Sequence, residues 1–189
     1  MTQSPNPLAG QVALITGAAH RIGAHIARGL HAEGMDLVLH YRRSAGAAEA
    51  LKGELEETRP DSVLTLQADL HHVELFPRLI AQIDQWRGRL DLLVNNASTF
   101  YRTPLERATE EQWEDLLGIN LKAPFFLARH AATLLRASNG AVINLVDIDG
   151  GSYTLSVTGG SYQLLSRDVS EWEDGWTVSP ELYCEVEQR

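Results

Sequence analysis

The segment TGAAHRIG, residues 16–23, has residue types that can bind a phosphate through the main chain. It lies between a short apolar run and a segment in which apolar residues recur at helical spacing. Small side chains let the backbone approach phosphate oxygens, and the start of a helix favours negative charge. Arg21 stands where such segments often have glycine, and a plain tight turn that needs Gly17 is the alternative interpretation. We therefore expect a pyrophosphate-binding turn here.

The segment HYRRS, residues 40–44, follows the second apolar run and indicates which dinucleotide such a turn would bind. A carboxylate at this place would hydrogen-bond the ribose 2′-hydroxyl of NAD and repel a 2′-phosphate. Arg42, Arg43 and Ser44 instead supply positive charge and a hydroxyl donor, and the guanidinium fork suits phosphate oxygens. NADPH is therefore predicted over NADH, with a solvated basic loop as the alternative.

These segments need a sheet to bring them together, and the chain alternates apolar runs with helical patterns. Near-continuous apolar strands are typical of a sheet that is covered on both faces. Right-handed crossovers then predict an α/β fold with a doubly wound, Rossmann-like parallel sheet. A long helical region at 109–137 is expected to bend at Gly118 or Pro124. The five expected strands are 11–16, 35–40, 62–69, 90–96 and 140–147.

Ligands of doubly wound sheets bind at the carboxyl ends of the strands. At these ends Asp69 could accept a hydrogen bond from the adenine amino group, while Asn95 and Ala97 would line the adenosine side. The polar residues expected at the five ends are Thr16, His40, Asp69, Asn95 and Asp147.

Taken in order, several motifs resemble those of the short-chain dehydrogenase/reductases, and within them the pteridine reductases. They cover about residues 8–148. NNASTFY, NLKAPFF and VDI favour the pteridine reductase branch, because most relatives have NNAG and a serine where this chain has Asp147. The motifs are TGAAHRIG, HYRRSAGAAEAL, LQADL, LLVNNASTFYRTPL, INLKAPFFLARH and INLVDI.

The resemblance implies NADPH as cofactor and a dihydropterin or dihydrofolate as the small-molecule substrate. Phe100 would stack on the pterin ring, with Ser98 and Tyr101 beside it, although a core aromatic under a loop is the alternative for Phe100. Asn120 would hold a water in a proton relay, or simply satisfy backbone groups at a helix kink. Asp147 would help to protonate the pterin, or else cap the next turn. The implied cofactor-binding residues are Gly17, Arg21, Ile22, Gly23, His40, Arg42, Arg43, Ser44, Asp69, Leu70, Asn95, Ala97 and Ser98.

Catalysis in the resembled family uses a Tyr-x-x-x-Lys pair on the helix after the fifth strand, where the lysine charge lowers the tyrosine pKa. Here Tyr153 is followed four residues later by Val157, and Tyr162 by Ser166. No lysine follows Lys122. Two hypotheses stay open: an active NADPH-dependent reductase, and an NADPH-binding module with impaired turnover, such as a truncated, fused or frameshifted reductase. A third is that the C-terminal segment binds a partner.

Composition changes near residue 149, which divides the chain into a dinucleotide-binding domain at 1–148 and an atypical segment at 149–189. All seven histidines precede the change, and the later segment has two basic against eight acidic residues. SYTLSV at 152–157 and SYQLLS at 161–166 predict a β-hairpin, followed by a polar and partly disordered stretch. The loss of the family's usual helix would expose apolar surface, so a homo-oligomer is one expected assembly.

Overall composition predicts a soluble cytoplasmic protein. The 189 residues, of which 44% are hydrophobic, suffice for one domain with a real core. A net charge of −9 disfavours a general nucleic-acid surface. The amino end resembles no signal peptide, and no apolar stretch approaches the roughly 18 residues of a membrane span. One cysteine excludes an intramolecular disulfide, and no metal site is expected.

Overall fold

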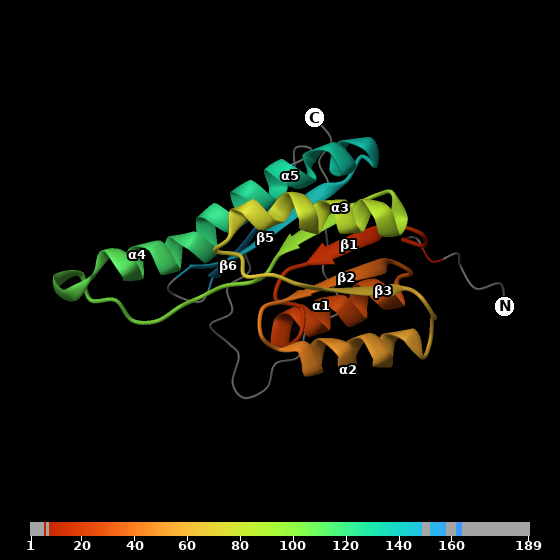
Figure 1. Ribbon diagram of the computed structural model, residues 1–189, viewed down its shortest axis with the longest axis horizontal. Coiled ribbons are helices and arrows are strands. Elements are labelled where there is room, and N and C mark those ends of the chain that lie inside the picture. Colours follow the sequence, from red (N-terminus) through yellow and green to blue (C-terminus); the bar gives the residue numbers. More distant parts are fainter. Residues whose placement is uncertain (1–5, 7, 149–151, 158–161, 164–189) are drawn as a thin grey trace.

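The computed structural model describes Asn6 and residues 8–148, 152–157 and 162–163. Its centre is a sheet of five parallel strands in the spatial order β3-β2-β1-β4-β5, with helices on both faces (Figure 1). Two further strands continue the sheet antiparallel beyond β5. The strands are β1 (Val12–Ile15), β2 (Asp36–Tyr41), β3 (Val63–Gln67), β4 (Leu92–Asn95), β5 (Ala141–Ile148), β6 (Ser152–Val157) and β7 (Tyr162–Gln163).

The helices form two layers around this sheet (Figure 1). Helices α1 and α2 cover one face, α3 and α5 cover the other, and α4 extends beyond the sheet in line with α5. The doubly wound, Rossmann-like parallel sheet predicted from the sequence is confirmed. The helices are α1 (Arg21–Ala32), α2 (Ala45–Glu56), α3 (Phe76–Arg87), α4 (Glu110–Leu117) and α5 (Ala123–Ala137).

Strand β1 shows why the sheet strands are continuous apolar runs. Val12 and Leu14 belong to the core that packs against α3 and α5. Ala13 and Ile15 belong to the core that packs against α1 and α2. All four side chains are fully buried, because successive residues of a strand face opposite sides of the sheet and both sides are covered.

The helical region expected at 109–137 is two α-helices joined by a π-helix at Gly118–Lys122. Thr109 starts α4 with a capping box, in which its hydroxyl accepts from Gln112 N and the Gln112 side chain accepts from Thr109 N. The irregularity lies at Gly118 rather than at Pro124. Pro124 is placed in the first turn of α5, where a missing N–H is tolerated.

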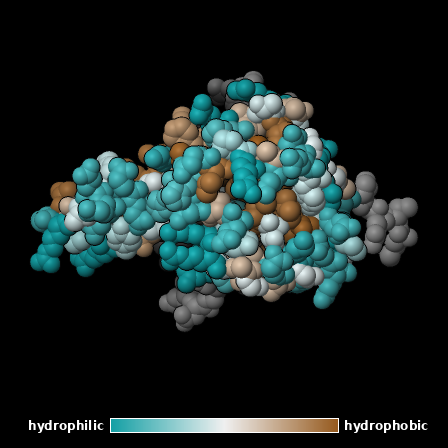
Figure 2. Space-filling view, in the orientation of Figure 1, coloured by the Kyte–Doolittle hydropathy of each residue, from teal (hydrophilic) through white to brown (hydrophobic). Residues whose placement is uncertain are grey.

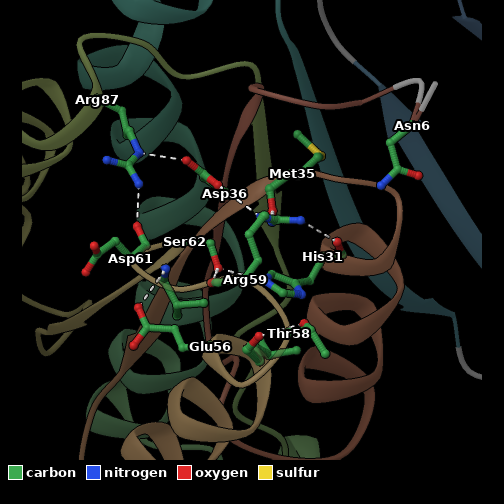
Figure 3. A network of polar contacts seen from close by, with 12 residues as sticks. Asn6, His31, Met35, Asp36, Glu56, Thr58, Arg59, Asp61, Ser62 and Arg87 are labelled. Carbon is green, nitrogen blue, oxygen red and sulfur yellow. Dashed lines mark hydrogen bonds and ion pairs between the residues drawn. The ribbon is translucent and has the colours of Figure 1, made fainter.

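A network of polar contacts ties together the amino ends of β2 and β3 (Figure 3). Asp36 accepts a hydrogen bond of 2.7 Å from Arg87 Nε, and Arg59 Nε lies 3.6 Å from its other oxygen. On the α1 side, Nε2 of the buried His31 lies 2.7 Å from Ser62 Oγ. The network therefore holds the end of the sheet opposite to the strand tips at which ligands of this fold bind.

Within the described ranges, no helix is both long enough and apolar enough to span a membrane.

Candidate dinucleotide and substrate site

The turn between β1 and α1 packs directly against the residues that follow β4. Gly17 has a φ of +64°, in the left-handed region, and a Cβ there would lie 3.1 Å from Ala97 Cα. A Cβ at Gly23 would lie 2.5 Å from the Gly17 carbonyl oxygen and 2.7 Å from Asn96 Nδ2. The tight turn weighed as an alternative is thus present, and it leaves no room for a side chain at either glycine.

Thr16 and Asn96 fasten this turn to the end of β4. Thr16 Oγ1 accepts hydrogen bonds from Asn96 N at 2.9 Å and Ala97 N at 3.0 Å. In return, Asn96 Nδ2 donates to the Thr16 carbonyl at 2.8 Å and to the Gly17 carbonyl at 3.1 Å. Ala97, predicted to line the adenosine side, is held against Gly17 by these bonds.

His40 supports the same turn from the end of β2. Its Nδ1 accepts from Gly17 N at 3.2 Å, and its Nε2 donates to the Ala68 carbonyl at 3.1 Å. Burial lowers the pKa of His40 to about 4, although the Ala68 carbonyl and the charge of Asp69 act in the opposite direction. His40 is therefore a neutral support beneath the turn, and its buried ring does not face a ligand.

The two predicted arginines after β2 have different surroundings. Arg42 Nε lies 2.9 Å from Asp69 Oδ2, so this guanidinium is partly engaged by a carboxylate. Arg43 is exposed and forms no ion pair among the residues that the structure describes. Ser44 precedes α2, but its side chain makes no capping bond to the helix. Arg43 and Ser44 thus keep their donors available.

Asp69 is the acceptor at the tip of β3. Its Oδ1 accepts from His71 N at 3.1 Å and lies 3.0 Å from His71 Nδ1. Partial burial opposes its charged form, but the hydrogen bonds from His71 and the charges of Arg42 and His71 outweigh burial and lower the pKa of Asp69. Asp69 is therefore a carboxylate at neutral pH, able to accept a further hydrogen bond from an amino group.

Three other predicted cofactor residues lie at the start of α1 and after β3. Arg21 is exposed with a φ of +47°, and Ile22 is 44% exposed. Both stand at the helix amino end, where negative charge is favoured. The side chain of Leu70 is buried in the core between the sheet, α3 and α5, so only its main chain can contact a ligand.

The loop after β4 carries the next predicted residues. Asn95 is buried, and its Nδ2 donates to Asn144 Oδ1 on β5 at 2.7 Å. Ser98 is exposed. Asn120, in the π-helix, accepts from Thr99 N at 3.1 Å and donates to the Thr99 carbonyl at 2.7 Å. Asn120 therefore satisfies backbone groups, as weighed from the sequence, but those of the loop rather than of its own helix.

Phe100 and Tyr101 follow on the same loop. Phe100 is 90% exposed, so the alternative of a core aromatic residue is wrong for the described structure. Tyr101 is partly buried, and burial together with the nearby carboxylate of Asp115 raises the pKa of its hydroxyl. The loop thus exposes the ring of Phe100, while Tyr101 lies near Asp115 of α4.

Asp147 belongs to β5, where its main chain pairs with Tyr153 of β6 in an antiparallel register. The side chains of Asp147 and Tyr153 lie outside the described part of the structure, as do residues 164–189 of the C-terminal segment. The catalytic role predicted for Asp147 therefore stays a prediction.

Sequence reasoning did not assign roles to Asn96, to the Thr16 hydroxyl or to the pair His71 and Asp115. Thr16 and Asn96 directly follow apolar strands, which was the available signal for polar residues at strand tips. His71 and Asp115 lie 44 positions apart in sequence, with no local pattern to connect them. Among the described residues, no three His, Cys, Asp or Glu side chains are grouped so as to hold a metal ion.

Comparison with known proteins places this geometry in a family. The model of the short chain dehydrogenase family matches residues 11–158. Pteridine reductase 1 of Leishmania tarentolae is 39% identical, over 78% of this chain and 63% of that protein. The 3-oxoacyl-[acyl-carrier-protein] reductase FabG of Staphylococcus aureus is 35% identical, over 73% of this chain and 56% of that protein.

A solved structure agrees with the sequence comparison. A metagenomic short-chain oxidoreductase, crystallised in complex with NADP, has a TM-score of 0.70 and 34% identity, over 76% of this chain and 65% of that one. The chain thus spans between about half and two thirds of the lengths of these proteins. The family model covers most of this chain, and the chain therefore belongs to the short-chain dehydrogenase/reductase family.

Proposed function

We propose that this chain binds NADPH and takes part in the reduction of a pterin- or dihydrofolate-like substrate. The observation that carries the proposal is the glycine turn, in which main chain closes on main chain and a Cβ at Gly23 would strike the Gly17 carbonyl at 2.5 Å. Such a turn at a helix amino end fits a pyrophosphate. The solved relative in complex with NADP supports the choice of ligand.

The residues around the turn fit the remaining parts of the dinucleotide. Among the described residues nothing engages the donors of Arg43 and Ser44, which stand where a ribose 2′-phosphate would lie. Arg42 adds positive charge while it pairs with Asp69. Asp69 is charged at neutral pH and suits the adenine amino group. When bound, NADPH supplies the hydride, and these residues of the chain bind and orient it.

The substrate part of the proposal rests on the loop after β4. Phe100 offers a free ring face for a flat heterocycle, with Ser98 exposed two residues before it. Asn120 holds the loop through Thr99, and Asp147 would supply the proton. The likeness to pteridine reductase 1 supports a pterin, whereas the likeness to FabG leaves acyl carriers as a competing substrate class.

A second candidate is an NADPH-binding protein with little turnover. The specific observation is that residues 152–157 form a strand that pairs antiparallel with β5. The family resemblance implies a helix with a Tyr-x-x-x-Lys pair at this stage of the chain. Tyr153 lies within the strand, and no lysine follows Lys122 in the sequence. The lysine charge that would lower a tyrosine pKa is then missing.

One preparation tests both candidates. NADPH binding is measured by calorimetry, and NADPH oxidation is followed at 340 nm with dihydrobiopterin and, separately, with an acetoacetyl thioester. Binding with dihydrobiopterin-dependent oxidation is the expected result for the reductase. Binding without oxidation of either substrate supports the second candidate, and oxidation with the thioester alone overturns the pterin assignment. No binding overturns both candidates.

We also propose that a second copy of the chain covers part of α4, the π-helix and α5. Trp113, Leu121 and Phe125 are each more than 60% exposed on the described surface, which favours association of apolar groups.

A further inference from the structure

A continuous chain of polar contacts connects the predicted adenosine end of the site to the loop that carries Phe100. It begins with Arg42 Nε, 2.9 Å from Asp69 Oδ2. Asp69 Oδ1 lies 3.0 Å from His71 Nδ1, and His71 Nε2 lies 3.0 Å from Asp115 Oδ1 on α4. Next along the loop is the hydroxyl of Tyr101, whose pKa is raised by burial and by the nearby carboxylate of Asp115. The order along this chain is Arg42, Asp69, His71, Asp115 and Tyr101.

His71 is the central member, because its ring lies between two carboxylates. Nε2 is buried and 3.0 Å from Asp115 Oδ1, although the pair lacks hydrogen-bond geometry. A Cβ at residue 118 would lie 3.0 Å from His71 Cδ2, so Gly118 gives the ring its space at the start of the π-helix.

Helix α4 has few other means of attachment to the domain. None of its eight residues is buried, and it extends beyond the sheet (Figure 1). On the face seen in Figure 2, most of the surface over α4 is hydrophilic. Between α4 and His71 lies an open cavity of about 570 Å³, lined mainly by acidic side chains. The contacts of Asp115 are therefore important for the position of α4 and of the loop before it.

We propose that His71 is a positioning residue that couples NADPH binding to the substrate loop, residues 98–109. This inference rests on the proposed function, since Arg42 and Asp69 lie where the adenosine end of NADPH would bind. A ligand that orders Asp69 also orders its hydrogen bonds to His71, and His71 then orders Asp115 and Tyr101. The loop that presents Phe100 becomes better ordered when the cofactor is bound.

Hydrogen exchange measures this coupling directly. The exchange of peptides that cover 99–117 is compared with and without NADPH in wild-type protein, in His71→Asn and in Asp115→Asn. Asparagine at 71 keeps a donor near Asp69 but cannot reach Asp115. Asp115→Asn leaves the shape of the side chain unchanged, and it lies on a helix that has no buried residues. This variant therefore tests the same contact if His71→Asn does not fold. Glu114→Gln, which changes a neighbouring carboxylate that lines the same cavity, is the matched control.

NADPH is expected to slow exchange at 99–117 several-fold in wild-type protein and in Glu114→Gln. In His71→Asn and Asp115→Asn this protection should be lost, while the NADPH dissociation constant changes less than about threefold. His71→Gln, whose amide can reach toward Asp115, should restore part of the protection. Substrate KM should rise in His71→Asn more than kcat falls, because the loop is displaced while the bound cofactor is not.

The outcomes separate this inference from the proposed function. If wild-type protein binds NADPH but exchange at 99–117 is not slowed, the coupling is overturned and the cofactor site stands. The same holds if NADPH still slows exchange at 99–117 in His71→Asn. Wild-type protein that does not bind NADPH overturns the proposed function. In that case the contact of His71 with Asp115 is tested in the protein without NADPH. Equal exchange at 99–117 in wild type and His71→Asn overturns a positioning role for this contact, and faster exchange in the variant supports it.

Discussion

Gly17 N donates a hydrogen bond to Nδ1 of His40 at 3.2 Å, so the glycine turn rests on a histidine that must be neutral. The opposite ring nitrogen donates to the Ala68 carbonyl at 3.1 Å, which leaves Nδ1 as the acceptor. Burial lowers the pKa of His40 from 6.5 to about 4. The stability of the turn at the tip of β2 therefore depends on pH, which would not be the case if His40 were exposed.

We expect the free energy of unfolding to fall as the pH drops from 6.5 toward 4. In that window the unfolded chain binds a proton at residue 40 that the folded chain does not, and above 6.5 neither form binds it. The loss across the window is on the order of 3 kcal/mol. Urea unfolding at a series of pH values measures it.

In His40→Asn, the amide oxygen can accept from Gly17 N but does not titrate, so the stability of this variant should depend less steeply on pH. His20→Gln, a change at an exposed histidine, should keep the wild-type slope. Equal slopes for wild type and His40→Asn would show that His40 is not the group responsible.

Gly23→Ala should destabilise the protein and abolish high-affinity NADPH binding. The new methyl group would lie 2.5 Å from the Gly17 carbonyl oxygen, and the backbone of the turn cannot give way without losing its bonds to β4. We expect a loss of about 1–3 kcal/mol, as for overpacked sites. Thermal unfolding and calorimetric titration measure the two effects.

Gly29→Ala is the matched control for this change, because it lies on the same helix and a Cβ there meets nothing within 4 Å. Alanine should stabilise α1 by up to about 1 kcal/mol. If both variants lost stability alike, the crowding at Gly23 would not be the cause.

Thr16→Val should cost on the order of 2 kcal/mol of stability, because it removes the acceptor for two backbone N–H groups, Asn96 and Ala97. The shape of the side chain is nearly unchanged, so packing contributes little. Thr16→Ser keeps the hydroxyl and should retain most of the stability in urea. A Val variant as stable as the wild-type protein would show that these two hydrogen bonds contribute little.

Arg43→Ala should weaken NADPH binding about tenfold or more and leave NADH binding nearly unchanged, because only NADPH carries the 2′-phosphate. Arg42→Ala is less selective as a test, since it also removes the partner of Asp69. Arg78→Ala removes the same charge from an exposed position on α3 and controls for net charge. Competition titrations give the dissociation constants of each variant for NADPH and NADH. An equal loss of affinity for both dinucleotides in Arg43→Ala would refute the assignment of Arg43.

The order and type of the elements could be derived from the sequence by itself. Apolar runs such as 12–15 and 37–39 predict strands covered on both faces, and the structure buries them completely. The positions of the strand tips could also be predicted, because each strand ends where its apolar run stops. Thr16, His40, Asp69 and Asn95 were placed at the correct edge of the sheet for this reason.

What these side chains do there was decided by the tertiary structure. His40 turns inward beneath Gly17, Arg42 pairs with Asp69 while Arg43 stays exposed, and Thr16 bonds the main chain 80 positions later. Periodicity reports how each residue is buried within its own element. It does not report which side chains meet across elements, because that depends on the packing of strand tips and loops brought together from distant parts of the chain.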